Sequence, residues 1–117
     1  DDANTYGSNL ISAYEVHEVG IQNILDRIPD DVDFYVTIDA DGMDPTIMPA
    51  VNAPTPGGLN WLQIRELIHG IVKKGKVIGL DLVEISPRFE KGNTTLIHAE
   101  RLICNFIGSA VRAGYYE

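Results

Sequence analysis

Residues 32–41 read Val-Asp-Phe-Tyr-Val-Thr-Ile-Asp-Ala-Asp, and a second apolar run, residues 77–85, reads Val-Ile-Gly-Leu-Asp-Leu-Val-Glu-Ile. Both runs are rich in β-branched residues, and they are continuously rather than alternately hydrophobic from Val32 to Ile38 and from Val77 to Ile85. Strands that are buried on both faces of a parallel sheet have this pattern. We therefore expect two parallel strands.

The segment between these runs has the pattern of a helix. Asn60 is a suitable N-cap for a helix through Lys74, and apolar residues recur there at the spacing of one helical face: Ile64, Leu67, Ile68, Ile71 and Val72. Lys73 and Lys74 complement the C-terminal end of the helix dipole, and Gly75 is expected to take the left-handed C′ position. The order strand, loop, helix, strand predicts a β-α-β unit.

Further elements are expected on either side of this unit. The last helix is predicted to start near Asn93 or Thr94 and to pack on the sheet with one apolar stripe: Leu96, Ala99, Leu102, Ile103, Phe106, Ala110 and Val111. Upstream, Leu10 to Ala13 is predicted as a short strand and Val16 to Ile28 as a helix, which Gly20 weakens. This alternation predicts an α/β fold with three α-β-α layers, a parallel sheet and right-handed crossovers.

Composition restricts the class of protein. The chain has 117 residues, 44% of them hydrophobic, which is enough for one core but too little for two ordinary domains. Its formal net charge of −8 disfavours binding to nucleic acid and to anionic membrane surfaces, and no apolar stretch approaches the roughly 20 residues of a membrane span. Cys104 lies in an apolar run and is expected to be a buried, inert thiol, which fits a reducing cytoplasm.

Asp39 and Asp41 end the first apolar run and are the strongest candidates for a site. Open α/β sheets bind ligands at the carboxyl ends of their strands, and residues two apart on a strand point to the same side. Two carboxylates brought together repel unless a cation or a shared proton compensates them, so a divalent cation such as Mg, Ca or Mn is expected. The alternative is that both aspartates cap a turn by accepting hydrogen bonds from the amides of Gly42 and Met43.

The residues around and after Asp39 and Asp41 help to decide between a metal site and a turn cap. Residues 37–45 read Thr-Ile-Asp-Ala-Asp-Gly-Met-Asp-Pro, residues 53–58 read Ala-Pro-Thr-Pro-Gly-Gly, and residues 79–87 read Gly-Leu-Asp-Leu-Val-Glu-Ile-Ser-Pro. These motifs resemble the C-terminal part of the ureohydrolases, the arginase and agmatinase family. The later segment Gly-Asn-Thr-Thr, residues 92–95, is similar to the agmatinase branch. The resemblance spans most of the chain.

The resemblance implies roles for particular residues. Asp39 and Asp41 match two metal-ligand aspartates of a binuclear manganese site, and Glu84 matches the acid that pairs with the guanidinium group of the substrate. The alternative for Glu84 is a capping or surface role. Asp44 and Asp81 are expected to brace the loop and the strand end by hydrogen bonds. The implied reaction is the Mn²⁺-dependent hydrolysis of a small cationic guanidino compound, agmatine or similar, to urea and an amine.

The chain also departs from the family pattern. The family's upstream metal motifs, Gly-Gly-Asp-His and Asp-Ala-His-x-Asp, do not occur, so residues 1–117 are expected to be the C-terminal segment of a single ureohydrolase domain without its N-terminal half. His17, His69 and His98 fall in predicted helices and are expected to be surface or packing residues rather than ligands. We expect a partial metal site and no activity in the chain alone. The loop 50–54, Ala-Val-Asn-Ala-Pro, replaces the family's Gly-Thr-Gly-Thr-Pro, which leaves the substrate open.

Two other functions are compatible with parts of the sequence. A haloacid-dehalogenase-type phosphatase also places Asp-x-Asp after a strand, with Asp39 as its nucleophile, although Met43 and the Pro-Gly-Gly continuation are foreign to that family. A non-catalytic interaction module would associate through an exposed sheet edge and apolar surface. As a ureohydrolase, the parent protein is expected to be a cytoplasmic homo-oligomer, a trimer or hexamer as in the family.

Overall fold

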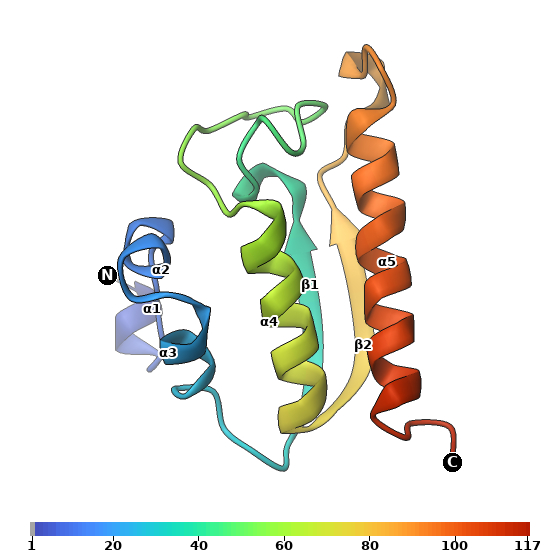
Figure 1. The fold of residues 1–117 in the computed structure, drawn as a ribbon. Helices are drawn as coiled ribbons and strands as arrows, with labels where there is room; N and C mark the ends of the chain where they lie inside the picture. Colours follow the sequence, from blue (N-terminus) through green and yellow to red (C-terminus); the bar gives the residue numbers. More distant parts are fainter. Residues whose placement is uncertain (1) are drawn as a thin grey trace.

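A computed structural model describes residues 2–117 of the chain. Seven helices and strands follow one another, with a short 3-10 helix after each strand: α1 (Asp2–Thr5), α2 (Ala13–Val19), α3 (Ile21–Leu25), β1 (Asp33–Asp39), η1 (Ala40–Gly42), α4 (Trp61–Lys74), β2 (Lys76–Val83), η2 (Pro87–Phe89) and α5 (Thr94–Arg112). Both strands end at loops that lie at one edge of the fold, where Figure 1 places the tips of the two arrows. This edge carries the candidate site.

The two strands form a parallel sheet. Asp33 pairs with Lys76 at one end and Asp39 with Val83 at the other, with one irregularity in the register between Phe34 and Tyr35. The crossover through α4 is right-handed, because β2 lies to the right of β1 when α4 faces the viewer (Figure 1). The predicted α/β class with a parallel sheet is therefore confirmed.

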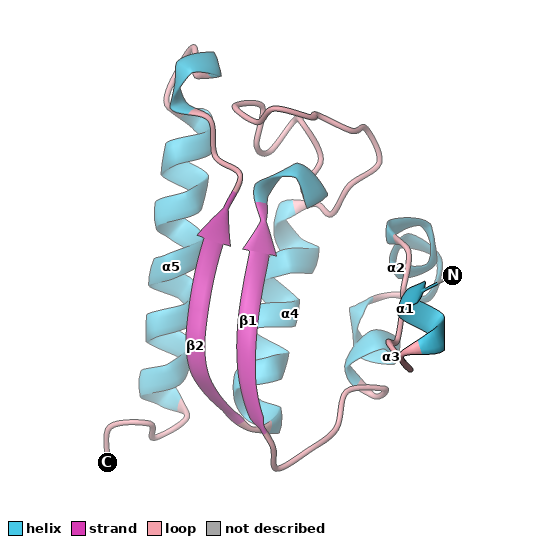
Figure 2. Cartoon of the chain, turned by 180° about the vertical axis from the view of Figure 1, so that it is seen from behind, coloured by secondary structure: helices cyan, strands magenta, loops and turns pink. Residues whose placement is uncertain are grey.

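Both long helices cover the same face of the sheet. Figure 2, seen from behind, shows β1 and β2 in front of α4 and α5. The main core lies in this layer and includes two methionines from the loop after η1, Met43 and Met48, which are 2% and 0% exposed. A second cluster joins α2 and α3 to α4 through Val16, Ile24 and Leu25. The N-terminal helices therefore pack on α4 and not on the sheet.

The other face of the sheet is open among the described residues. Exposure alternates along β1, and Tyr35 is 65% exposed while Ile78 of β2 is 63% exposed. The prediction of strands buried on both faces is wrong for this part of the chain, because residues 2–117 supply a helical layer on one side only. The apolar residues of the open face still indicate a surface that is suited to a covering layer.

Helix α4 begins as the sequence predicts but ends differently. Asn60 accepts a hydrogen bond from the amide of Gln63, whose side chain accepts one from the amide of Asn60, so the two residues form a capping box. Gly75 is extended (φ −175°) and not left-handed, which corrects the prediction for the C-terminus. A glycine is needed there because a Cβ atom would lie 2.1 Å from the carbonyl oxygen of Val32. The Tyr115 hydroxyl donates to the Gly75 carbonyl at 2.7 Å and closes this end of the helix.

The N-terminal predictions need two corrections. The segment from Leu10 to Ala13 is not a strand, because Ser12 is the N-cap of α2 and accepts a hydrogen bond from the amide of Glu15. The predicted helix from Val16 to Ile28 is broken at Gly20, which adopts φ 79° and separates α2 from α3. The left-handed region is accessible to glycine at little cost, so this break follows from the residue that weakened the prediction.

Helix α5 starts at Thr94 as predicted, but its stripe is divided. Ala99, Leu102 and Ala110 are buried, whereas Leu96, Ile103 and Val111 of the same predicted stripe are 42%, 42% and 54% exposed. Cys104 is exposed, which corrects the expectation of a buried thiol, because it lies on the outward side of α5. None of the described helices, α5 included, is both long and apolar enough to cross a membrane.

Candidate metal centre

Asp39 and Asp41 lie where β1 passes into η1. Asp39 is the last residue of the strand and the N-cap of η1, and its Oδ1 accepts a hydrogen bond from the amide of Asp41 at 2.8 Å. The capping alternative is thus correct in part: Asp39 caps the turn, but its partner is the Asp41 amide, while the Met43 amide donates to the carbonyl of Ala40. Ala40, between the two aspartates, is fully buried in the core and fixes the turn.

The carboxylate of Asp41 has an unsatisfied oxygen. Its Oδ1 atom is buried and has no hydrogen-bond partner among the described residues. A buried carboxylate oxygen without a donor is costly, so such an atom calls for a donor or a cation from outside these residues. Oxygen donors from two neighbouring aspartates suit a hard divalent cation, and the residues present therefore fit a metal such as Mn²⁺.

The loop after η1 is braced by Asp44. Its Oδ1 accepts hydrogen bonds from the amide and the hydroxyl of Thr46 at 3.0 and 2.6 Å, and its Oδ2 accepts one from the amide of Gly57 at 2.9 Å. The hydrogen bonds from Thr46, followed by the one from Gly57, hold the pKa of Asp44 below its usual value. The predicted bracing role of Asp44 is confirmed.

The same loop is joined to the exit of β2. Ala50, which is fully buried, accepts a hydrogen bond from the amide of Ser86 at 2.8 Å, and Val51 forms an antiparallel bridge with Ile85. The amide of Ala50 in turn donates to the buried hydroxyl of Thr95 at 2.9 Å. These contacts hold the segment that follows Asp41 against the segment that contains Glu84.

Glu84 follows β2 directly and lies next to the residue that pairs with Asp39, Val83. It is exposed and adopts φ 64°, in the left-handed region that a glutamate rarely occupies. Such a conformation costs about 1–2 kcal/mol, and strain of this kind, held in place by the surrounding structure, is concentrated at functional sites. The register places the backbone of Glu84 at the same edge as Asp39, while its role in binding a guanidinium group stays a prediction.

Asp81, which was expected to brace the strand end by hydrogen bonds, has a hydrogen-bond partner on the open sheet face that the sequence did not indicate. Tyr35 lies opposite Gly79 in the register, and its hydroxyl donates to Oδ2 of Asp81 at 3.0 Å. This hydrogen bond and the charge of Asp81 raise the pKa of Tyr35. Gly79 leaves room for the ring in this position, because a Cβ atom there would lie 2.5 Å from the Tyr35 side chain. The other oxygen of Asp81, Oδ1, is buried and has no partner among the described residues.

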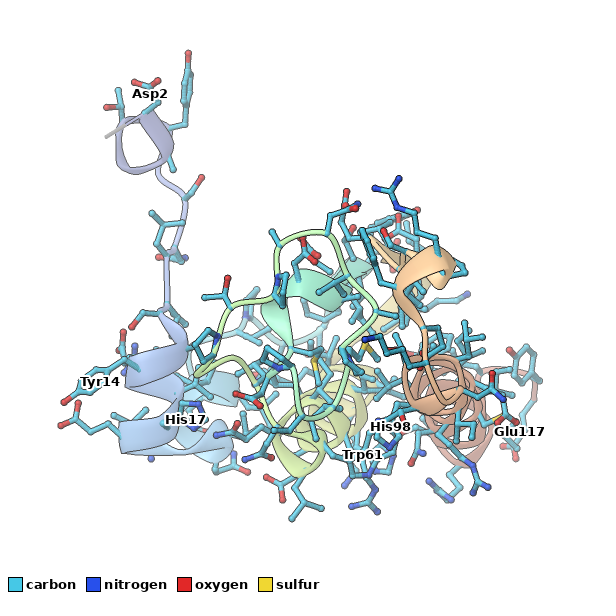
Figure 3. All side chains as sticks on the ribbon, turned by 90° about the horizontal axis from the view of Figure 1, so that it is seen from above. Asp2, Tyr14, His17, Trp61, His98 and Glu117 are labelled. Carbon is cyan, nitrogen blue, oxygen red and sulfur yellow. The ribbon has the colours of Figure 1, made fainter. Side chains whose placement is uncertain are left out.

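The three histidines lie in helices, away from the strand ends, as predicted. His69 of α4 contacts the side-chain oxygen of Asn105, and burial lowers its pKa. His98 of α5 contacts the carbonyl of Ile47 at 2.7 Å and lies beside Trp61, as Figure 3 shows. His17 of α2 contacts the loop before α4. Within residues 2–117, no three His, Cys, Asp or Glu side chains are grouped closely enough to hold a metal ion by themselves.

Comparisons with known proteins agree with this geometry. The Arginase family model matches residues 1–108. The chain is 32% identical over 107 residues to the N(1)-aminopropylagmatine ureohydrolase of Thermus thermophilus, an alignment that covers 90% of this chain and 34% of that protein. It is 31% identical over 104 residues to the agmatinase of Chromobacterium violaceum, covering 86% and 32%. The chain thus spans about a third of the length of these relatives.

Solved structures show the same relationship. The proclavaminate amidino hydrolase of Streptomyces clavuligerus superposes with a TM-score of 0.85 at 30% identity, covering 97% of this chain and 39% of that one. The agmatine ureohydrolase of Thermoplasma volcanium superposes with a TM-score of 0.82 at 33% identity, covering 98% and 38%. These matches leave no support for the phosphatase alternative. The chain belongs to the arginase family, and the agmatinase-like relatives are among its matches.

Proposed function

We propose that this chain is the C-terminal portion of a manganese-dependent ureohydrolase, which hydrolyses a guanidino compound to urea and an amine. The observation that carries the proposal is the pair Asp39 and Asp41 at the carboxyl end of β1, with a buried Oδ1 of Asp41 that no described residue satisfies. Family membership supports the reaction class. The names of the relatives, agmatinase and ureohydrolase, support a guanidino substrate.

In this proposal, Asp39 and Asp41 contribute oxygen ligands to a pair of Mn²⁺ ions. When bound, the two ions supply the Lewis acidity that activates water near neutral pH and stabilises developing negative charge. The chain's own residues do the rest of the positioning. Asp39 keeps the turn in place by accepting a hydrogen bond from the amide of Asp41, and Ala40 between the two aspartates is fully buried in the core.

Glu84 is proposed to bind the guanidinium group. A carboxylate can accept two parallel N–H donors from such a group, and this geometry orients the guanidinium carbon. The strained backbone at Glu84, with φ 64°, turns the chain out of the strand immediately after the residue that pairs with Asp39. Binding and metal chemistry would therefore occur at one edge of the sheet.

We further propose that the chain alone is inactive. Two carboxylates provide fewer ligands than a binuclear site requires, and the described residues contain no group of three candidate ligands. The remaining ligands would come from a part of the enzyme outside this chain. Exposed apolar residues on the open sheet face and on α5, such as Tyr35, Ile78 and Ile107, support association with that part or with further subunits of a homo-oligomer.

Urea release tests the proposed function. The 117-residue chain and a form extended upstream would be incubated with Mn²⁺ and with a panel of agmatine, guanidino acids and guanidino amines. Activity is expected in the extended form only, and it should be lost in Asp41→Asn and retained in Asp33→Asn, a control at the opposite end of β1. Absence of urea from every substrate with the extended form would contradict the reaction class. Urea release by the short chain would contradict its proposed inactivity.

A further inference from the structure

His17 connects an early helix to loop residues that lie 40 and 41 positions later in the chain. The side chain lies on α2, and its Nε2 is 3.3 Å from the carbonyl oxygen of Gly57 and 3.1 Å from that of Gly58. Its Nδ1 is 3.0 Å from the side-chain nitrogen of Gln63 in the first turn of α4. In Figure 3, His17 lies on the side of α2 that faces the rest of the molecule, and Tyr14 lies on the outer side.

The hydrogen-bond pattern selects one tautomer of the neutral His17 ring. The side-chain oxygen of Gln63 accepts the amide of Asn60 in the capping box, so the Gln63 nitrogen is the group that faces His17. That nitrogen can only donate, so Nδ1 of His17 must accept and the ring proton must lie on Nε2. Nε2 then donates to the two glycine carbonyls. The neutral Nε2–H tautomer is the form that satisfies every partner.

The second of these glycines, Gly58, is closely packed against the beginning of the loop. A Cβ atom on Gly58 would lie 2.7 Å from the carbonyl oxygen of Gly42 and 2.7 Å from the amide nitrogen of Asp44. Two backbone hydrogen bonds of 3.0 Å, from Leu59 to Gly42 and from Asp44 to Leu59, close the base of the loop. Gly42 follows Asp41 directly. A continuous set of contacts therefore runs from His17 to the turn that carries the candidate metal ligands.

We propose that His17 is a positioning residue for the candidate metal centre. By binding the carbonyls of Gly57 and Gly58, it holds Gly58 against Gly42, restricts the motion of the turn at Asp41 and keeps the unsatisfied carboxylate oxygen in place. His17 itself binds neither metal nor substrate in this role. The significance for metal binding rests on the proposed function, whereas the mechanical connection does not.

Two substitutions separate the hydrogen bonds from the bulk of the side chain. In His17→Gln, the amide nitrogen can reach the position of Nε2 and donate to the glycine carbonyls. In His17→Asn, the amide nitrogen lies near the position of Nδ1, too far from those carbonyls to replace the donor. The assay is hydrogen exchange of individual amides in the 117-residue chain, measured by NMR, at Leu59 and Asp44. The amides of Val36 and Leu82 in the paired strands serve as internal references for an intact fold.

The expected result is faster exchange at Leu59 and Asp44 in His17→Asn by about three- to tenfold, since exposed hydrogen bonds each contribute modestly. In His17→Gln, exchange should stay within about twofold of the wild type. Unchanged exchange in His17→Asn would overturn the proposal. Equal acceleration in both variants would also overturn it, because the ring would then act through packing and not through its donor.

A second arm adds Mn²⁺ alone and follows the broadening of the Asp41 amide signal. His17→Asn should need about three- to tenfold more Mn²⁺ than the wild type for the same broadening, and His17→Gln should restore the wild-type response. Equal Mn²⁺ responses of the wild type and His17→Asn would overturn the positioning role. If Mn²⁺ leaves Asp41 unaffected in the wild type while exchange responds as expected, the connection between His17 and the loop is supported and the proposed metal function fails.

Discussion

Replacing Thr95 by valine should destabilise the chain and loosen the candidate site at the same time. Thr95 and Ala50 are both 0% exposed, and the Thr95 hydroxyl accepts the amide hydrogen of Ala50 at 2.9 Å. Valine has nearly the shape of threonine but cannot accept this hydrogen bond. The substitution therefore leaves a buried backbone N–H group without an acceptor.

The magnitude follows from this geometry. An unsatisfied buried amide costs about 1–3 kcal/mol, and the added apolar group of valine returns roughly 0.5–1 kcal/mol through burial. We expect a decrease of about 1–2 kcal/mol in the free energy of unfolding. Because the carbonyl of Ala50 also accepts the amide of Ser86, exchange of the Ser86 amide should accelerate as well.

Urea unfolding, followed by the fluorescence of Trp61, measures this change. Trp61 is the only tryptophan and lies 5.3 Å from His98, between ring centroids, so it reports on the contact between α4 and α5. The midpoint should fall while the slope with urea is unchanged. Thr94→Val, at the half-buried neighbouring position, is the control and should stay within about 0.5 kcal/mol of the wild type. Equal stability of Thr95→Val and the wild type would refute the reasoning.

Three further predictions concern the strained residue, the braced loop and the open sheet face. Glu84→Gly should raise the free energy of unfolding in urea by about 0.5–1 kcal/mol, because it relieves about 1–2 kcal/mol of backbone strain at φ 64° and part of this gain is offset by the greater entropy of the unfolded chain. The same substitution should abolish activity in the extended enzyme. Asp31→Gly, at φ 58°, should stabilise similarly and leave activity intact, and equal activity of the two variants would contradict the role of Glu84. Because the pKa of Asp44 is lowered in the folded state, its contribution to stability is present above roughly pH 4 and is lost as the pH falls through the folded-state pKa. Asp44→Asn should therefore make the free energy of unfolding less sensitive to acid. An unaltered pH profile of unfolding in this variant would count against the bracing role of Asp44. Removing the carboxylate in Asp81→Asn should return the raised pKa of Tyr35 toward about 10, as followed by NMR titration of the ring, and no change would show that Asp81 is not its cause.

Local patterns in the sequence predicted the parts of the fold that depend on neighbouring residues. The N-cap at Asn60, the start of α5 at Thr94 and the parallel β1-α4-β2 unit are all confirmed. These features follow from side-chain spacing and from cap chemistry, which act within a few residues. The same is true of the loop brace at Asp44, whose partner Thr46 is two residues away.

Features that depend on long-range packing were not predictable in the same way. The exposure of Cys104 is decided by which side of α5 faces the sheet, and the sequence stripe was too wide to settle that. Glycine is needed at position 75 because a side chain would clash with the carbonyl of Val32, 43 residues earlier, and not because the backbone makes a left-handed turn. The contacts of His17 with Gly57 and Gly58 likewise join distant segments, and no spacing pattern signals them.

The candidate site was predictable as a set of residue types but not as a geometry. The sequence motifs singled out Asp39, Asp41 and Glu84, and the register of β1 with β2 places Asp39 and Glu84 at one edge. The unsatisfied oxygen of Asp41 and the strain at Glu84 arise only once the turn and the strand exit are built. The hydrogen bond from Tyr35 to Asp81 joins residues on two strands, 46 positions apart, which no local pattern reveals.

Paramagnetic broadening by Mn²⁺ along β1 tests the central claim most directly. The strand rises about 3.3 Å per residue, so the amides of Asp33 and Asp39 lie roughly 20 Å apart. Mn²⁺ added to the 117-residue chain should broaden the signals at Asp39 and Asp41 first and the signal at Asp33 last, and Asp41→Asn should weaken this gradient. Broadening that is uniform along the strand, or that is unchanged in Asp41→Asn, would contradict a metal centre at this edge of the sheet.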